Sequence, residues 1–171
     1  MIALTAFAVA IPAFAPVLAQ DATSPSLLGK FDDWEALTFK EGQARVCYMG
    51  TRPKKSTGKY SKRGPVFFLV THRPAESAVG VIEIRTGYAF KKNSEPNVTI
   101  GENTYRLFSD GASAFARDAK TDSNLIRSMI RGASMVVKGT SSRGTLTTDT
   151  YSLKGFTAAY KVISEACEVS G

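Results

Sequence analysis

The sequence has few of the residues that usually carry metal or redox chemistry. Among its 171 residues there are two cysteines, Cys47 and Cys167, and a single histidine, His72. Two thiolates and one imidazole leave a tetrahedral zinc site one ligand short unless a carboxylate joins them. The cysteines are 120 positions apart, whereas the two thiols of a redox-active pair normally lie close in sequence. We therefore predict no metal site and no cofactor.

The N-terminal segment lacks charge altogether. Met1–Ala19 is almost entirely apolar, and Val17 and Ala19 are the small residues that signal peptidase needs at positions −3 and −1 of its cut. No Lys or Arg precedes the apolar run, as a signal peptide would normally have. The alternative is a transmembrane helix, because the run has about the minimum length that spans a bilayer. Pro12 and Pro16 interrupt that run, however, and no basic flank follows it. We predict a signal peptide over this segment and hence an exported protein.

Export decides how the two cysteines are interpreted. In an oxidising compartment, two cysteines without a CxxC motif favour one disulfide, Cys47–Cys167. The bond would enclose most of the mature chain. In the chain-entropy model a loop of that length stabilises the fold by roughly 4–5 kcal/mol.

Short apolar or alternating runs, separated by turn-forming residues, predict a mainly β domain. The run Pro65–Thr71 is apolar almost throughout and predicts a central strand buried on both faces. The other predicted strands cover residues 43–49, 79–86, 98–100, 104–108, 112–117, 134–138 and 147–153. This pattern is typical of a β-sandwich.

Two segments have helical spacing instead. The first covers residues 124–131, with Asp122 or Ser123 as its N-cap. The second covers residues 156–167 and places Cys167 on its apolar face. The predicted disulfide would therefore join an early strand to the last turn of a C-terminal helix.

The domain boundaries follow from these elements. Residues 1–19 are the predicted signal peptide, and residues 20–30, polar at their start and containing Pro25, are predicted to be a flexible mature N-terminus. Residues 31–171 form one domain, which is long enough to bury a substantial core.

Positive charge is in excess, with 22 basic and 15 acidic residues and a net charge of +7. The loop predicted over residues 50–64 is the densest basic segment. Such a loop either contacts an anionic partner or is simply a solvated surface. It lacks the interleaved aromatic residues of a single-strand nucleic-acid platform, so no specific nucleic acid is expected. The candidate contacts for an anionic partner are Arg52, Lys54, Lys55, Lys59, Lys62 and Arg63 in this loop, and Arg143 in the later turn.

Catalysis has little support in the sequence. His72 follows a predicted strand and is the one candidate general base, which leaves a small periplasmic hydrolase as an alternative. There is no nucleophile-elbow or metal motif, and we expect no enzyme activity. A small-ligand carrier with an apolar slot between two sheets is a further alternative.

Two segments resemble one protein family in the same order along the chain. The run Lys62–Pro74 (KRGPVFFLVTHRP) and the run Met135–Phe156, which includes MVVKGTSSRGT and TDTYSLKGF, are similar to the invasion-associated locus B family. The resemblance spans about Trp34 to Cys167. It implies an immunoglobulin-like β-sandwich in a bacterial protein of the periplasm or cell surface.

The resemblance brings no assigned activity with it, and together with the lack of a catalytic motif it leads us to expect a non-catalytic envelope protein. Its expected partner is a protein or an anionic group of the envelope or of a host-cell surface. Any membrane association is expected to be peripheral. The family name refers to host-cell entry, so a role in host-cell contact is a further expectation.

Overall fold

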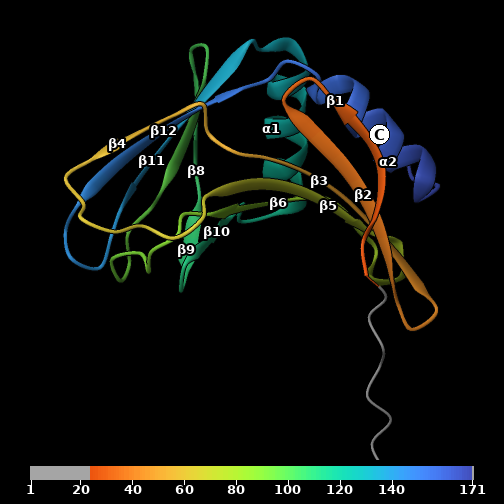
Figure 1. Cartoon of the computed structure of the whole chain (residues 1–171), viewed down its shortest axis with the longest axis horizontal. Coiled ribbons are helices and arrows are strands. Elements are labelled where there is room, and N and C mark those ends of the chain that lie inside the picture. Colours follow the sequence, from red (N-terminus) through yellow and green to blue (C-terminus); the bar gives the residue numbers. More distant parts are fainter. Residues whose placement is uncertain (1–23, 171) are drawn as a thin grey trace, which may run out of the picture.

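Antiparallel pairing of short strands builds the chain into two β-sheets, accompanied by two α-helices (Figure 1). The computed structural model describes residues 24–170. The seven-stranded sheet has the order β1 (Ser26–Phe31), β2 (Trp34–Glu41), β3 (Ala44–Thr51), β5 (Phe67–Arg73), β6 (Ala78–Arg85), β10 (Ser113–Phe115), β9 (Phe108–Asp110). The five-stranded sheet has the order β4 (Lys55–Gly58), β12 (Leu146–Ser152), β11 (Ser134–Thr140), β7 (Asn97–Ile100), β8 (Asn103–Arg106). The predicted mainly β domain with a C-terminal helix is confirmed.

The helices α1 (Ala119–Arg131) and α2 (Phe156–Ala166) cover the inner face of the seven-stranded sheet. Helix α1 packs against β6, and α2 packs against β1, β2 and β3. The predicted N-cap of α1 is wrong by about one turn. Asp118, rather than Asp122 or Ser123, is the N-cap, and its carboxylate accepts a hydrogen bond from the Thr121 amide at 2.7 Å.

Asp122 has a different role, at the end of a strand pairing. Strand β10 pairs with β6 only over Glu83–Arg85, so the amide of Ile82 lies beyond the end of β10. The Asp122 carboxylate accepts a hydrogen bond from that amide at 3.0 Å. Burial raises the pKa of Asp122 to about 6. A side chain of α1 thus replaces the strand carbonyl that the Ile82 amide lacks.

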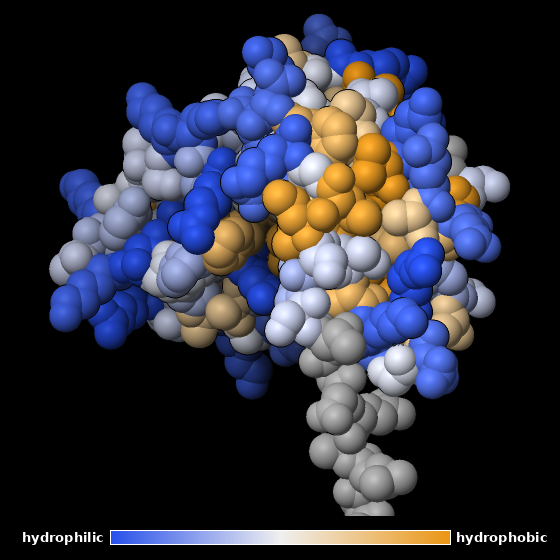
Figure 2. Space-filling model, turned by 45° about the vertical axis from the view of Figure 1, so that its right-hand side comes forward, coloured by the Kyte–Doolittle hydropathy of each residue, from blue (hydrophilic) through white to orange (hydrophobic). Residues whose placement is uncertain are grey.

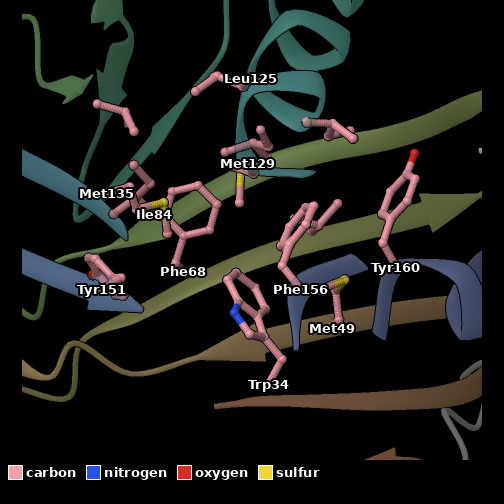
Figure 3. Packing of buried hydrophobic residues seen from close by; sticks show 14 of the residues in the cluster. Trp34, Met49, Phe68, Ile84, Leu125, Met129, Met135, Tyr151, Phe156 and Tyr160 are labelled. Carbon is pink, nitrogen blue, oxygen red and sulfur yellow. The ribbon is translucent and has the colours of Figure 1, made fainter. Parts of the chain in front are cut away.

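The core lies where the sheets and helices meet (Figure 3). Trp34 of β2 lies edge-on to Phe156 of α2, with 5.0 Å between ring centroids. Phe68 of β5 lies edge-on to Tyr151 of β12 at 5.8 Å. Burying each side chain of this size contributes about 2–3 kcal/mol relative to exposure. Because the aromatic contacts bridge β2 to α2 and one sheet to the other, both sheets and α2 share a single core.

The N-terminal boundary needs a correction. Residues 26–30 were predicted to be flexible, but they belong to β1, which pairs antiparallel with β2. The two strands are joined at Asp32 and Asp33, and Asp32 has a φ of 48°, a left-handed conformation that Asp tolerates in turns. The predicted signal peptide, residues 1–19, lies outside the described residues.

Two strand predictions are also corrected. Residues 50–64 are not one loop, because Lys55–Gly58 forms β4 and pairs with β12 at the edge of the five-stranded sheet. Strand β5 is not buried on both faces: Phe68 and Val70 point into the core, while Phe67 and Leu69 are half-exposed on the other face. Both faces of this strand carry apolar residues, and within residues 24–170 the chain packs over only one of these faces.

Candidate anion-binding site

Three of the predicted basic residues line one pocket of about 450 Å³ beside the β11–β12 loop. Lys59 and Lys62 come from the segment after β4, and Arg143 comes from the loop. We call this site the basic pocket. Tyr60 and Ser142 are also among its lining residues. Among the described residues, no aspartate or glutamate lines it.

The three cations of the basic pocket have no counter-ion among the described residues. Lys59, Lys62 and Arg143 are all exposed. Within residues 24–170, no carboxylate forms an ion pair with any of them, whereas ten such pairs occur elsewhere on the molecule. Uncompensated charges of one sign in a concave site concentrate the potential there and attract counter-ions. The site is therefore suited to an anion.

The loop that carries Arg143 is held in place by backbone hydrogen bonds. The Ser141 amide donates to the Thr145 carbonyl at 2.9 Å and closes the loop on itself. The Ser142 amide donates to the carbonyl of Ala89 at 2.8 Å and ties the loop to a distant segment. Because the backbone is fixed at both points, little ordering entropy remains to be lost in this loop when a ligand binds.

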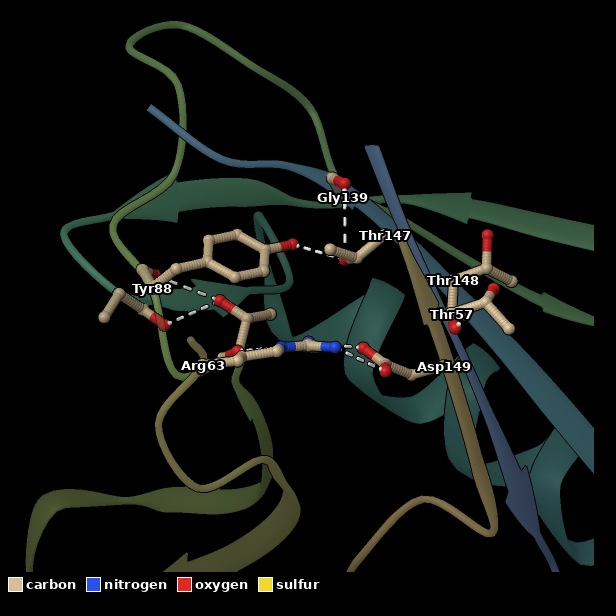
Figure 4. Close-up of polar contacts among 9 residues, drawn as sticks. Thr57, Arg63, Tyr88, Gly139, Thr147, Thr148 and Asp149 are labelled. Carbon is tan, nitrogen blue, oxygen red and sulfur yellow. Dashed lines mark hydrogen bonds and ion pairs between the residues drawn. The ribbon is translucent and has the colours of Figure 1, made fainter. Parts of the chain in front are cut away.

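Arg63 is not a surface contact, contrary to prediction. Its guanidinium donates two hydrogen bonds to the carboxylate of Asp149, at 2.7 and 2.6 Å, and a third from Nε to the carbonyl of Thr86 at 2.6 Å (Figure 4). The side chains of Arg63 and Asp149 are 5% and 1% exposed. A guanidinium with this many short internal bonds is a structural group that joins the segment after β4 to β12.

The buried ion pair also supports the wall of the basic pocket. The Arg63 guanidinium lies 5.0 Å from the ring centroid of Tyr88 and 5.6 Å from that of Tyr60. Both tyrosines line the pocket. The Tyr88 hydroxyl lies 2.6 Å from the Thr147 hydroxyl and forms a hydrogen bond with it (Figure 4). Arg63 thus positions the aromatic part of the pocket by cation–π contact, and only the exposed cations are accessible to an anion.

The other predicted contacts lie outside the basic pocket. Lys54 forms an ion pair with Asp33. The guanidinium of Arg52 lies over the Phe67 ring, 4.5 Å from its centroid. Lys55 is exposed on β4 at the sheet edge. The structure therefore gathers three of the seven predicted contacts and separates four of them.

His72 is fully buried and fills a gap in the strand pairing. The pairing of β5 with β6 is irregular between Thr71 and Arg73, and there the Gly80 amide donates to His72 Nδ1 at 2.9 Å. Since Nδ1 accepts, the ring proton is on Nε2, which lies 3.1 Å from the hydroxyl of Ser164. An imidazole that already donates to this serine cannot take its proton. The geometry gives His72 a structural role and does not support the hydrolase alternative.

Burial lowers the pKa of His72 from 6.5 to about 4. The unfolded chain therefore binds the proton more readily, and stability falls as pH decreases from about 6.5 to 4. The raised pKa of Asp122 acts in the opposite direction over part of this range.

The contribution of His72 to the pH dependence of stability can be measured by comparing the wild type with a variant that lacks the imidazole. The variant H72N retains an acceptor for Gly80 and does not titrate. Between pH 7 and pH 4 the wild type should lose roughly 3 kcal/mol of unfolding free energy relative to H72N. Urea denaturation across this range measures it, and the contribution of Asp122 cancels in the comparison. A constant difference at all pH values would contradict the assignment.

The predicted disulfide between Cys47 and Cys167 is present in the structure. Cys47 lies on β3, and Cys167 is the residue that ends α2. Next to the bond, Arg45 Nη1 donates to the carbonyl of Ala166 at 2.9 Å. A covalent bond and a hydrogen bond thus attach the last turn of α2 to the same strand.

The described residues contain neither a candidate metal site nor a candidate membrane-spanning helix. No cluster of three or more His, Cys, Asp or Glu side chains in residues 24–170 is arranged to hold a metal ion. None of the helices in this part of the chain has the length and apolar character needed to cross a membrane.

The alternation of residues in β12 is a signal for the buried ion pair. Thr147, Asp149 and Tyr151 alternate along β12, and all three point inward. An acidic residue at an inward position of a strand requires a buried cation as partner, since an isolated buried carboxylate is very costly. The nearest dense basic segment contains Arg63, whose role could have been inferred in this way.

Comparison with known proteins identified a family. The model of a family described as Invasion associated locus B (IalB) protein matches residues 34–164. Neither the curated proteins nor the solved structures include a match to the chain.

Proposed function

Because the chain belongs to the invasion associated locus B family, we propose that it is an exported, non-catalytic protein of the bacterial envelope or surface that binds an anionic partner through the basic pocket. The observation that carries the proposal is the grouping of Lys59, Lys62 and Arg143 around one pocket without a carboxylate. The ligand group is a phosphate, sulfate or carboxylate borne by an envelope or host-surface molecule. A role in host-cell contact would follow if that molecule belongs to the host.

The charge distribution of the molecule supports this choice of site. Many charges elsewhere are already compensated, as in the pairs Lys30–Glu35 and Arg117–Glu95. An anion that binds the basic pocket therefore meets cations that lose no internal partner. The overall charge of +7 adds long-range attraction to anionic surfaces, which raises the association rate at low salt.

Export is proposed on two grounds. The uncharged, apolar segment at residues 1–19 has the composition of a signal peptide. The disulfide between Cys47 and Cys167 is typical of a protein that matures in an oxidising compartment, such as the periplasm.

The binding prediction is tested with the triple variant K59Q/K62Q/R143Q. Each basic residue near an anionic surface contributes about 1 kcal/mol, so three should reduce affinity about a hundredfold. Co-sedimentation with phosphatidylglycerol vesicles and retention on immobilised heparin measure the loss. These two arms distinguish a lipid headgroup from an anionic glycan, and in both cases wild-type binding should weaken as salt rises.

The matched control is K120Q/R127Q/K161Q, which removes the same charge from the exposed surface of α1 and α2. It should retain most of the wild-type affinity. Equal losses in the two triple variants would contradict a specific site and leave only net charge as the cause. Wild-type protein that binds neither probe would also count against the proposal.

A further inference from the structure

The outer face of the seven-stranded sheet, opposite the helices, carries side chains that are typical of a covered face. We define it by Leu37, Phe39, Tyr48, Phe67, Leu69 and Val81, all of which are half-exposed. A sheet face in contact with water normally carries polar residues at the alternating outward positions. Here several of those positions, on four neighbouring strands, are aliphatic or aromatic.

The strand register brings these residues together. Leu37 pairs with Tyr48, Tyr48 with Thr71, and Thr71 with Val81, so that one row crosses β2, β3, β5 and β6. Two adjoining hollows of about 490 and 610 Å³ lie over this face and share Tyr48, Phe67 and Leu69. Figure 2 shows a continuous hydrophobic patch, bordered by hydrophilic residues, on the side of the molecule that carries this sheet.

The border of the outer face is electrically neutral. Five basic and five acidic side chains line the two hollows. Many of them are paired within the chain: Arg73 with Glu76, Arg85 with Glu83, and Lys54 with Asp33. A polyanion would therefore gain little here, in contrast to the basic pocket.

This charge balance determines what can cover the face. Two copies of a chain with net charge +7 repel each other, and the repulsion is weakest where the facing surfaces are neutral. A border of alternating sign can also meet its own copy with opposite charges opposed across a two-fold axis. Twisted sheets pack face to face at about 10 Å through interdigitating apolar side chains, which this face provides.

We propose that the outer face is the contact surface between two copies of this chain, which associate as a two-fold symmetric dimer with their seven-stranded sheets face to face. The dimer leaves the basic pockets free, since none of their lining residues belongs to the outer face. It does not depend on the proposed ligand.

The test is sedimentation velocity of the purified protein over about a hundredfold range of concentration, in which a shift from monomer to dimer is expected. The variant L69E should weaken the dimer at least tenfold, because it places a charge at the centre of the interface. V81T, which retains the shape and strand propensity of valine, should weaken it less. The control L146E makes the same change at a leucine of the five-stranded sheet that is 59% exposed, and it should leave the dimer unchanged.

Salt separates this proposal from binding at the basic pocket. Added salt should leave the dimer unchanged or strengthen it, since it screens the repulsion between two positive chains, whereas pocket binding weakens. A wild-type monomer at every concentration, or equal effects of L69E and L146E, would overturn the proposal. So would binding of neutral vesicles that L69E abolishes in a monomeric protein, because a lipid surface would then be the occupant.

Discussion

The double variant C47A/C167A is expected to have a free energy of unfolding about 4–5 kcal/mol below that of the wild type. The reason lies in the unfolded chain, where the bond closes a loop across a sequence separation of 120. Without the bond the unfolded chain has a higher conformational entropy, which lowers the free energy of unfolding. Urea denaturation under identical buffer conditions measures the difference.

Treatment of the wild type with a reductant provides a second route to the same comparison. The bond is buried, with Cys47 fully inaccessible and Cys167 5% exposed, so reduction should require partial opening of α2. The disulfide of the wild type should therefore be reduced slowly under native conditions. Wild type that has been denatured and reduced should have the same free energy of unfolding as C47A/C167A. If the double variant were as stable as the oxidised wild type, the bond would have no stabilising role.

The variant R63M is expected to lose about 3–5 kcal/mol of unfolding free energy. Methionine approximates the length of the arginine side chain but leaves the Asp149 carboxylate buried, 1% exposed, and without its cation. The carbonyl of Thr86 also loses a hydrogen bond. Most of the loss is thus the cost of an uncompensated buried charge, and thermal or urea unfolding measures it.

The double variant R63M/D149L provides the control. When both partners are replaced by apolar groups, no charge remains buried, and much of the stability lost in R63M should return. An exposed pair would behave differently, because removing one partner of a surface ion pair costs less than about 1 kcal/mol. If R63M loses so little, Arg63 is accessible to solvent and belongs with the predicted surface contacts.

Much of the fold could be predicted from periodicity. The hairpin of β11 and β12, the helix at residues 156–166 and the placement of Cys167 all follow from spacing of two or of 3.6 residues. Strand β1 was missed because its apolar residues, Leu27, Leu28 and Phe31, do not alternate with polar ones, and most of the strand is exposed. Strand β4 was missed because all of its residues are exposed and polar or small. They are held by the neighbouring strand, and no signal in their own sequence reports that pairing.

The candidate site could be predicted only in part. Composition identified the basic residues but could not distinguish Arg63, whose side chain is buried, from Lys62, which precedes it and is exposed. The distinction depends on Asp149, 86 positions away, which meets Arg63 only in the folded chain. The grouping of Arg143 with Lys59 has the same origin, because two loops distant in sequence meet beside one sheet.

The packing of α2 on β1, β2 and β3 has a consequence for the order of folding. The last helix of the chain covers the first three strands, so the native contacts of those strands have high sequence separation and form slowly. A chain that crosses a membrane pore from its N-terminus can complete this core only after residue 167 has emerged. For the exported protein that we propose, the same topology would delay completion of the core until after passage, and the oxidation of Cys47 and Cys167 would be the final step, on the far side.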